Sequence, residues 1–298
     1  MKKTRYILVF LGVAWVAYAA LAGNAPCRPQ SFGQLARLSD QELESVDIAR
    51  MNLLCAEGLP GSGNLDVDRC LEKLDRWAEH VLLMERKYAP AYQRNRSKYG
   101  NSLALFKGVY LGIAIEQDFN CGYNQGLLDS GAMDDRGSTR FFRDSSDVFI
   151  NGLIGSGKGS CSSLPVLMVA LGRRCNYPLY LVGCGGHAFT RWDDGSERVN
   201  LEITCQGVNT YSDEHYKEWP RPIDDEEIEQ EHLLRNYTGK EMLGVFSSLR
   251  AACLKEHKRY EEAKQCYEVA LGCFPRSRLL RLCMEDMDRK IKTQELKP

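Results

Sequence analysis

The residue best suited to catalytic chemistry is Cys161, at the end of the glycine-rich stretch 155–161. An apolar segment, 166–171, follows it with helical character, so we expect Cys161 at or near a helix N-terminus. The unpaired N–H groups there favour a thiolate, which is the nucleophilic form of cysteine. Glycines before the cysteine allow backbone or substrate to approach the sulfur closely. The pattern therefore predicts a cysteine nucleophile.

A cysteine nucleophile needs a base and a group that orients the base, and His187 and Glu202 are the candidates. Asp194-Gly195 lies between two expected strands, 187–192 and 197–204, and this dipeptide is a strong hairpin signal. A hairpin turn centred on Asp194-Gly195 places His187 directly opposite Glu202. Opposed residues share a face with Cβ atoms about 4.5–5.5 Å apart. His187 would take the thiol proton, and Glu202 would hold the imidazole.

The same register has two further consequences. It places Arg191 opposite Arg198, which requires that end of the hairpin to be solvated. It also places Glu197 opposite Trp192 on the other face. We therefore expect Glu202, and not Glu197, to be the acid.

Two other kinds of site compete for these residues. The stretch 152–158 fits most of a phosphate-binding loop, but Gly159 stands where a Mg²⁺-binding Ser or Thr is expected. Cys184 and His187, with Cys175 and Cys205, could be drawn as a zinc site, but their spacing is irregular. We expect neither a nucleotide nor a metal, and no cofactor.

The composition is that of an ordinary globular protein. The chain has 298 residues and a formal net charge of −1, which gives no reason to expect nucleic-acid binding. Basic residues near the N-terminus precede the apolar run 7–22, and small residues end it, as in a secretory signal peptide covering 1–22. The alternative is an uncleaved anchor that tethers the protein to a membrane. We expect export to the periplasm or outside the cell.

Export would permit disulfides, and the chain has 12 cysteines. Apolar spacing predicts one helix over 33–56 and a second over 67–87 with Asp66 as its N-cap, separated by the break 58–63. An antiparallel pair of such helices would bring Cys55 and Cys70 together, so they are a candidate disulfide.

Beyond this hairpin we expect a helix over 103–115, a strand over 179–182 and helices from 223 to the C-terminus. Residues 260–275 have the spacing of the second half of a tetratricopeptide repeat. They indicate either a helical pair packed on the main domain or a partner-binding module.

Several motifs carry a family resemblance: 159–167 around Cys161, Gly172-Arg173-Arg174, Tyr177-Pro178, His187, Arg191-Trp192, Asn200-Leu201-Glu202, the upstream 51–60, and Asp213-Glu214-His215-Tyr216 with Trp219-Pro220. Together they resemble the SirB1-type branch of the transglutaminase-like superfamily over most of residues 45–275. The resemblance implies an α+β, papain-like core with a nucleophile helix packed on an antiparallel sheet. It implies Cys161 as nucleophile, His187 as base and Glu202 as acid.

These observations predict a signal peptide or anchor over 1–22, a helical region over 23–105, a transglutaminase-like core over 106–222 and a helical, tetratricopeptide-like region over 223–298. The expected activity is cysteine-dependent acyl transfer on a protein or peptide, as an amide hydrolase or a transglutaminase. The alternative is an inactive scaffold that binds a protein partner through its C-terminal helices.

Overall fold

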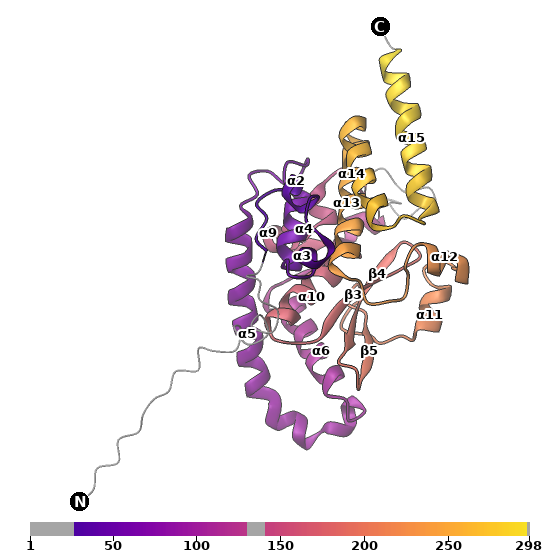
Figure 1. Cartoon of the computed structure of the whole chain (residues 1–298). Coiled ribbons are helices and arrows are strands. Elements are labelled where there is room, and N and C mark those ends of the chain that lie inside the picture. The colour runs from indigo at the N-terminus through magenta and orange to yellow at the C-terminus, as the bar shows by residue number, and fades with distance from the viewer. Residues whose placement is uncertain (1–26, 130–140, 297–298) are drawn as a thin grey trace, which may run out of the picture.

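The computed structural model describes residues 27–129 and 141–296 (Figure 1). The expected signal peptide or tether lies outside these residues. Among the helices described, none is both long enough and apolar enough to cross a membrane.

The segment expected as one helix over 33–56 forms three: α2 (Phe32–Leu35), α3 (Asp40–Glu44) and α4 (Ile48–Ala56). Periodicity alone missed the breaks because the apolar spacing continues through them. Each helix starts at its own cap: the side chains of Ser31, Ser39 and Asp47 accept backbone N–H groups.

The second expected helix is confirmed as α5 (Val67–Arg94), with Asp66 as its N-cap. It continues past the expected end through Pro90, and the short 3-10 turn η1 (Arg96–Tyr99) follows.

Cys55 and Cys70 are both free thiols in the structure, so the expected bond between them is absent from it. Cys55 is fully buried at the end of α4, where its neighbouring thiols are Cys266 and Cys273. Cys70 is partly buried among charged side chains of α5.

The middle of the chain leads to the site through short elements. Helix α6 (Leu103–Ile113) continues as the π-helical turn η2 (Ala114–Asp118). Strand β1 (Gly122–Tyr123), α7 (Gln125–Asp129), α8 (Ser145–Val148), α9 (Ile150–Ser156) and strand β2 (Lys158–Gly159) follow. β1 and β2 pair in parallel, with Tyr123 opposite Gly159.

The second sheet is antiparallel, in the order β3 (Leu179–Cys184), β4 (His187–Asp193), β5 (Arg198–Leu201). Gly185 and Gly186 form a tight loop between β3 and β4 with φ of 38° and 91°, values that glycine adopts without strain. Helix α10 (Leu164–Arg174) packs against β3 and β4 (Figure 1).

The expected register of β4 and β5 is wrong by two residues. Asp193 pairs with Arg198 and Arg191 with Asn200, so the loop is the four residues 194–197. The Asp194 side chain accepts three hydrogen bonds from Ser196 and Glu197, which fixes this longer turn. The correction removes the opposition of two arginines, because Arg198 pairs with Asp193 at 2.8 Å. A shift by two keeps every side chain on its expected face.

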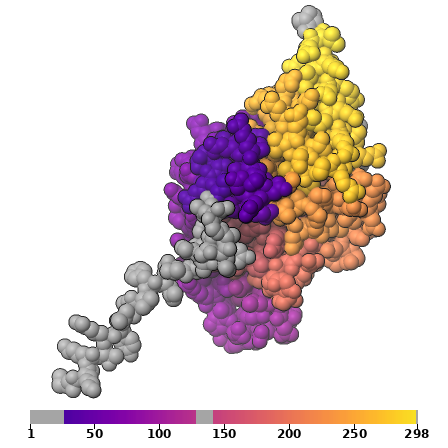
Figure 2. All heavy atoms as spheres, in the orientation of Figure 1, coloured from indigo at the N-terminus to yellow at the C-terminus, as the bar shows by residue number. Residues whose placement is uncertain are grey.

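The C-terminal third is helical: α11 (Asp213–Glu218), α12 (Asp225–Gln230), α13 (Gly239–Glu256), α14 (Tyr260–Cys273) and α15 (Arg278–Glu295). α14 packs on α13 and on α15, and α13 packs on α4. Figures 1 and 2 show α15 projecting at one end of the molecule.

One hydrophobic cluster runs from Leu35 to Met287 and includes α4, α10, α13 and α14. A smaller cluster joins β3 and β4 to α11 through Val182, Cys184, Phe189, Tyr216 and Ile223. The mixed α+β class is confirmed, as a largely helical chain with two small sheets.

Candidate functional site

Cys161 lies in the turn that leads into α10. The Leu164 N–H donates to the Ser160 carbonyl at 2.9 Å, and the Ser160 N–H donates to the Ser163 hydroxyl at the same distance. These bonds hold the turn, and Cys161 is partly exposed. Its own N–H has no hydrogen-bond partner within the ranges described. It is therefore free to bind an oxygen beside the thiol.

His187 and Glu202, the two expected partners, are in contact. The His187 Nε2 lies 2.8 Å from Glu202 Oε2, with side chains only 5% and 1% exposed. The contact is diagonal across the sheet, because Glu202 follows Leu201, the last paired residue of β5, which lies opposite Thr190 and not opposite His187. Diagonal neighbours on one face remain within reach of long side chains.

Hydrogen bonds engage both carboxylate oxygens of Glu202. Oε1 accepts the Thr204 N–H at 2.9 Å and the Thr204 hydroxyl at 2.6 Å. Oε2 accepts the Tyr216 hydroxyl at 3.1 Å besides facing His187. Burial alone would raise the pKa of Glu202, but the hydrogen bonds from His187 and Thr204 and the charge of His187 lower it. Glu202 is therefore a fixed carboxylate.

The thiol of Cys161 interacts with the other side of the imidazole. Burial opposes protonation of His187, but hydrogen bonding to Cys161 and Glu202, together with their charges, raises its pKa to about 9. Because Nε2 faces Glu202, Nδ1 is the ring nitrogen left for the thiol. At neutral pH this arrangement favours a protonated His187 imidazole beside the Glu202 carboxylate.

Aromatic rings pack around the His187 imidazole. Phe189 stacks on Tyr216 with ring centroids 3.8 Å apart, and the Trp219 ring meets the His187 ring at 4.6 Å and 71°. Edge-to-face packing of this kind limits rotation of the imidazole.

Tyr123 borders the sulfur from the parallel sheet. Its buried hydroxyl lies beside the Cys161 thiol, within hydrogen-bonding reach of it. Burial, and then the proximity of that thiol, raise the pKa of Tyr123, so the hydroxyl stays protonated. Together with the Cys161 N–H, the Tyr123 hydroxyl gives the site two hydrogen-bond donors near the sulfur.

These groups open onto a cleft of about 590 Å³. Aromatic, aliphatic and polar side chains form its walls, and Glu116 is the one acidic residue among them. The lining residues are Glu116, Cys121, Gly122, Tyr123, Gln125, Cys161, Gly186, His187, Ile203, Thr204, Cys205, Gln206, Trp219 and Pro220. The cleft is large enough for an extended peptide side chain and its carbonyl.

Neither competing site is assembled by the residues that the structure describes. Residues 152–156 of the phosphate-loop pattern lie within helix α9, so no loop is available there to cradle a phosphate. Cys175 is buried at the end of α10 with its thiol on the Ala78 carbonyl, whereas Cys205 is exposed. No group of three or more metal-ligating side chains is gathered within the described ranges.

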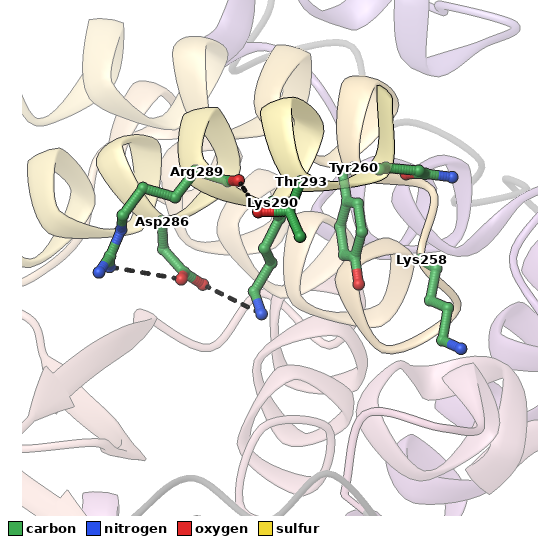
Figure 3. Close-up of a pocket in the computed structure, with 7 residues that line it drawn as sticks. Lys258, Tyr260, Asp286, Arg289, Lys290 and Thr293 are labelled. Carbon is green, nitrogen blue, oxygen red and sulfur yellow. Dashed lines mark hydrogen bonds and ion pairs between the residues drawn. The ribbon is translucent and has the colours of Figure 1, made fainter. Parts of the chain in front are cut away.

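A second pocket, of about 500 Å³, lies between α15 and the start of α14 (Figure 3). Asp286 there pairs with Arg289 at 3.5 Å and with Lys290 at 4.0 Å. No cysteine or histidine lines this pocket, so it offers neither a thiol nucleophile nor an imidazole base.

Sequence reasoning assigned no role to Tyr123, Thr204 or Glu116. Tyr216 and Trp219 stand in the motifs that carry the resemblance, which was the available signal for them. Tyr123 and Glu116 reach the cleft from 38 and 45 residues before Cys161, and no local pattern marks them.

The chain was compared with protein-family models, with curated proteins and with solved structures, and no match was found in any of the three.

Proposed function

We propose that this protein is a cysteine-dependent acyl-transfer enzyme with a transglutaminase-like, papain-like core. The observation that supports it best is the line of contacts from Cys161 through His187 to Glu202 at the edge of one cleft. Helix α10 after the thiol and the antiparallel sheet behind the imidazole are the layers such a core requires.

In the proposed reaction, the Cys161 thiolate attacks a carbonyl carbon of an amide. The resulting oxyanion is stabilised by the free Cys161 N–H, with Tyr123 as a second donor. The imidazolium of His187 gives its proton to the leaving amine, and a thioester remains on Cys161. Water or another amine, deprotonated by His187, then attacks the thioester and releases the thiol.

Alkylation of Cys161 with iodoacetamide tests the dyad without knowledge of the substrate. At about pH 6 the wild type should react rapidly, and His187→Ala should lower the rate about 100-fold because the thiolate loses its charge partner. Mass spectrometry of the Cys161 peptide separates this thiol from the exposed Cys205. If the alkylation rate of Cys161 had the same pH profile in His187→Ala as in the wild type, the proposed pairing of Cys161 with His187 would be wrong. Substrate profiling with a Cys161→Ala control then identifies the acyl donor.

The second candidate is a non-catalytic scaffold that binds a protein partner. It is favoured by α15, which exposes Leu279 and Leu282 by 61% and 52%. Slow alkylation of Cys161 together with retained binding at these helices would favour this scaffold.

A further inference from the structure

The active-site cleft contains an acidic side chain that the proposed triad does not use. Glu116 lines the cleft and is half-buried, and no hydrogen bond or ion pair engages its carboxylate among the described residues. It is the only Asp, Glu, Lys or Arg among the residues that line the cleft.

The local backbone holds Glu116 in this place. It sits in the π-helical turn η2, where the Phe119 N–H donates to the Ala114 carbonyl at 2.9 Å. Single π-turns inside helices are frequent at functional sites. Just after Glu116, Asp118 bonds to His80 at 2.8 Å and Phe119 stacks on Trp77 at 4.5 Å. Both contacts anchor the turn on α5 and leave Glu116 at the cleft.

Two of the other charged side chains near the cleft are already paired, and Lys73, close to the cleft residue Cys121, donates to the Ile154 carbonyl at 2.5 Å. His187 lies between Glu202 and the Cys161 thiol. Arg221, which follows the cleft residue Pro220, is paired with Glu227. The carboxylate of Glu116 thus has no ion-pair partner among the described residues and borders the space where a substrate would lie.

We propose that Glu116 is a specificity residue that selects substrates bearing a positive charge, such as a primary ammonium or a basic side chain near the acyl group. This proposal rests on the proposed acyl-transfer function, since it takes Cys161 as the reacting centre. A fixed carboxylate in a partly enclosed cleft raises the local concentration of cations and disfavours anions.

Charged thiol reagents test the proposal without turnover. A Cys205→Ser background removes the other exposed cysteine of the cleft. We would measure the rates at which the cationic trimethylammonium-ethyl and the anionic sulfonato-ethyl methanethiosulfonates modify Cys161. Glu116→Gln should lower the ratio of cationic to anionic rates at least about five-fold at about 0.1 M salt. The difference should shrink at about 1 M salt, where the Debye length is about 3 Å.

The matched control is Glu79→Gln, which removes the same charge from an exposed side chain of α5 outside the cleft. It should leave the ratio within about two-fold of the parent at about 0.1 M salt, where the Debye length is about 10 Å and a charge outside the cleft is screened. An unchanged ratio in Glu116→Gln, or an equal change in both variants, would overturn the proposal. The proposed function is judged separately, by the pH profile of His187→Ala.

Turnover assays then locate the positive charge on the substrate. If it belongs to the amine acceptor, Glu116→Gln should lower aminolysis relative to hydrolysis of the same neutral acyl donor. If it belongs to the donor, the variant should lower kcat/KM for basic donors and spare neutral ones. Equal rates for charged and neutral substrates in both proteins would contradict the assignment.

Discussion

At the scale of single residues, the candidate triad depends on which glutamate reaches His187. Glu202 is fixed by Thr204 and Tyr216 and lies 2.8 Å from the imidazole. Glu197 lies in the loop between β4 and β5, where it faces the Ala104 N–H at 3.4 Å. The two carboxylates therefore have different environments despite their closeness in sequence.

Glu202→Gln should slow alkylation of Cys161 at about pH 6 by roughly ten-fold, less than His187→Ala does. The amide can still face the imidazole, but it no longer carries the charge that raises the pKa of His187. Glu197→Gln is the matched control and should leave the rate unchanged. Equal effects in the two variants would show that Glu202 has no special role.

At the scale of elements, the glycine-rich stretch closes a helix and begins a strand. Gly157 ends α9 with φ of 77°, and a Cβ there would lie 2.2 Å from the Asn120 carbonyl oxygen. This close approach lets β2 pair with β1, which places Tyr123 beside Cys161. At Gly155, two residues earlier, φ is not positive and an added Cβ would meet no atom within 4 Å.

Gly157→Ala should lower the free energy of unfolding by about 2 kcal/mol or more, because it combines backbone strain with a clash against a carbonyl. Gly155→Ala, inside α9, should be neutral or stabilise by up to about 1 kcal/mol. Urea unfolding followed by circular dichroism measures both. A loss in Gly155→Ala as large as that in Gly157→Ala would contradict this account.

A buried arginine ties the sheet to α11. Arg191 is 1% exposed and bonds to Asn200 at 2.7 Å, to the Leu234 carbonyl at 3.0 Å and to Asp213 at 2.5 Å. Arg198, on the neighbouring strand, has a side chain that is 61% exposed and pairs with Asp193 at the surface.

Arg191→Ala should therefore destabilise the protein by about 3 kcal/mol, since it leaves buried polar partners unpaired. Arg198→Ala should cost less than about 1 kcal/mol, as exposed ion pairs do. Chemical denaturation of the two variants gives the comparison. Similar losses of unfolding free energy in the two variants would contradict the expected difference between a buried and an exposed arginine.

At the scale of the whole molecule, the site links stability to pH. The folded state raises the pKa of His187 from 6.5 to about 9, so its contribution is complete below about pH 6.5 and is lost as the pH rises through about 9. The pKa of Glu202 is lowered from 4.5, so its contribution is present above that value and is lost on acidification.

The stability difference between the wild type and His187→Ala should therefore shrink between about pH 6.5 and 9, by an amount on the order of 2 kcal/mol. Urea unfolding of both proteins across this range measures it. Comparison with His187→Ala cancels the titration of the buried thiols. A difference that is constant with pH would show that His187 is not ionised in the folded protein.

The sequence by itself determined the chemistry-bearing residues and most local elements. Cys161 before a helix, His187 at the start of a strand and Asp66 as a cap follow from local physics: capping, turn residues and apolar period. The His187–Glu202 contact was also predicted, although the register was two residues off. The predicted contact is nevertheless present, because a register shift of two residues keeps both side chains on the same face of the sheet.

The tertiary structure alone decided what distant segments bring to the site. Tyr123 and Glu116 reach the cleft because Gly157 allows β1 to approach β2 and because α5 anchors the π-turn. Cys55 lies near Cys266 and Cys273 of α14 and is not bonded to Cys70, because α4 is buried on all sides between other helices. Such contacts depend on packing between elements far apart in the chain, and local sequence pattern does not encode them.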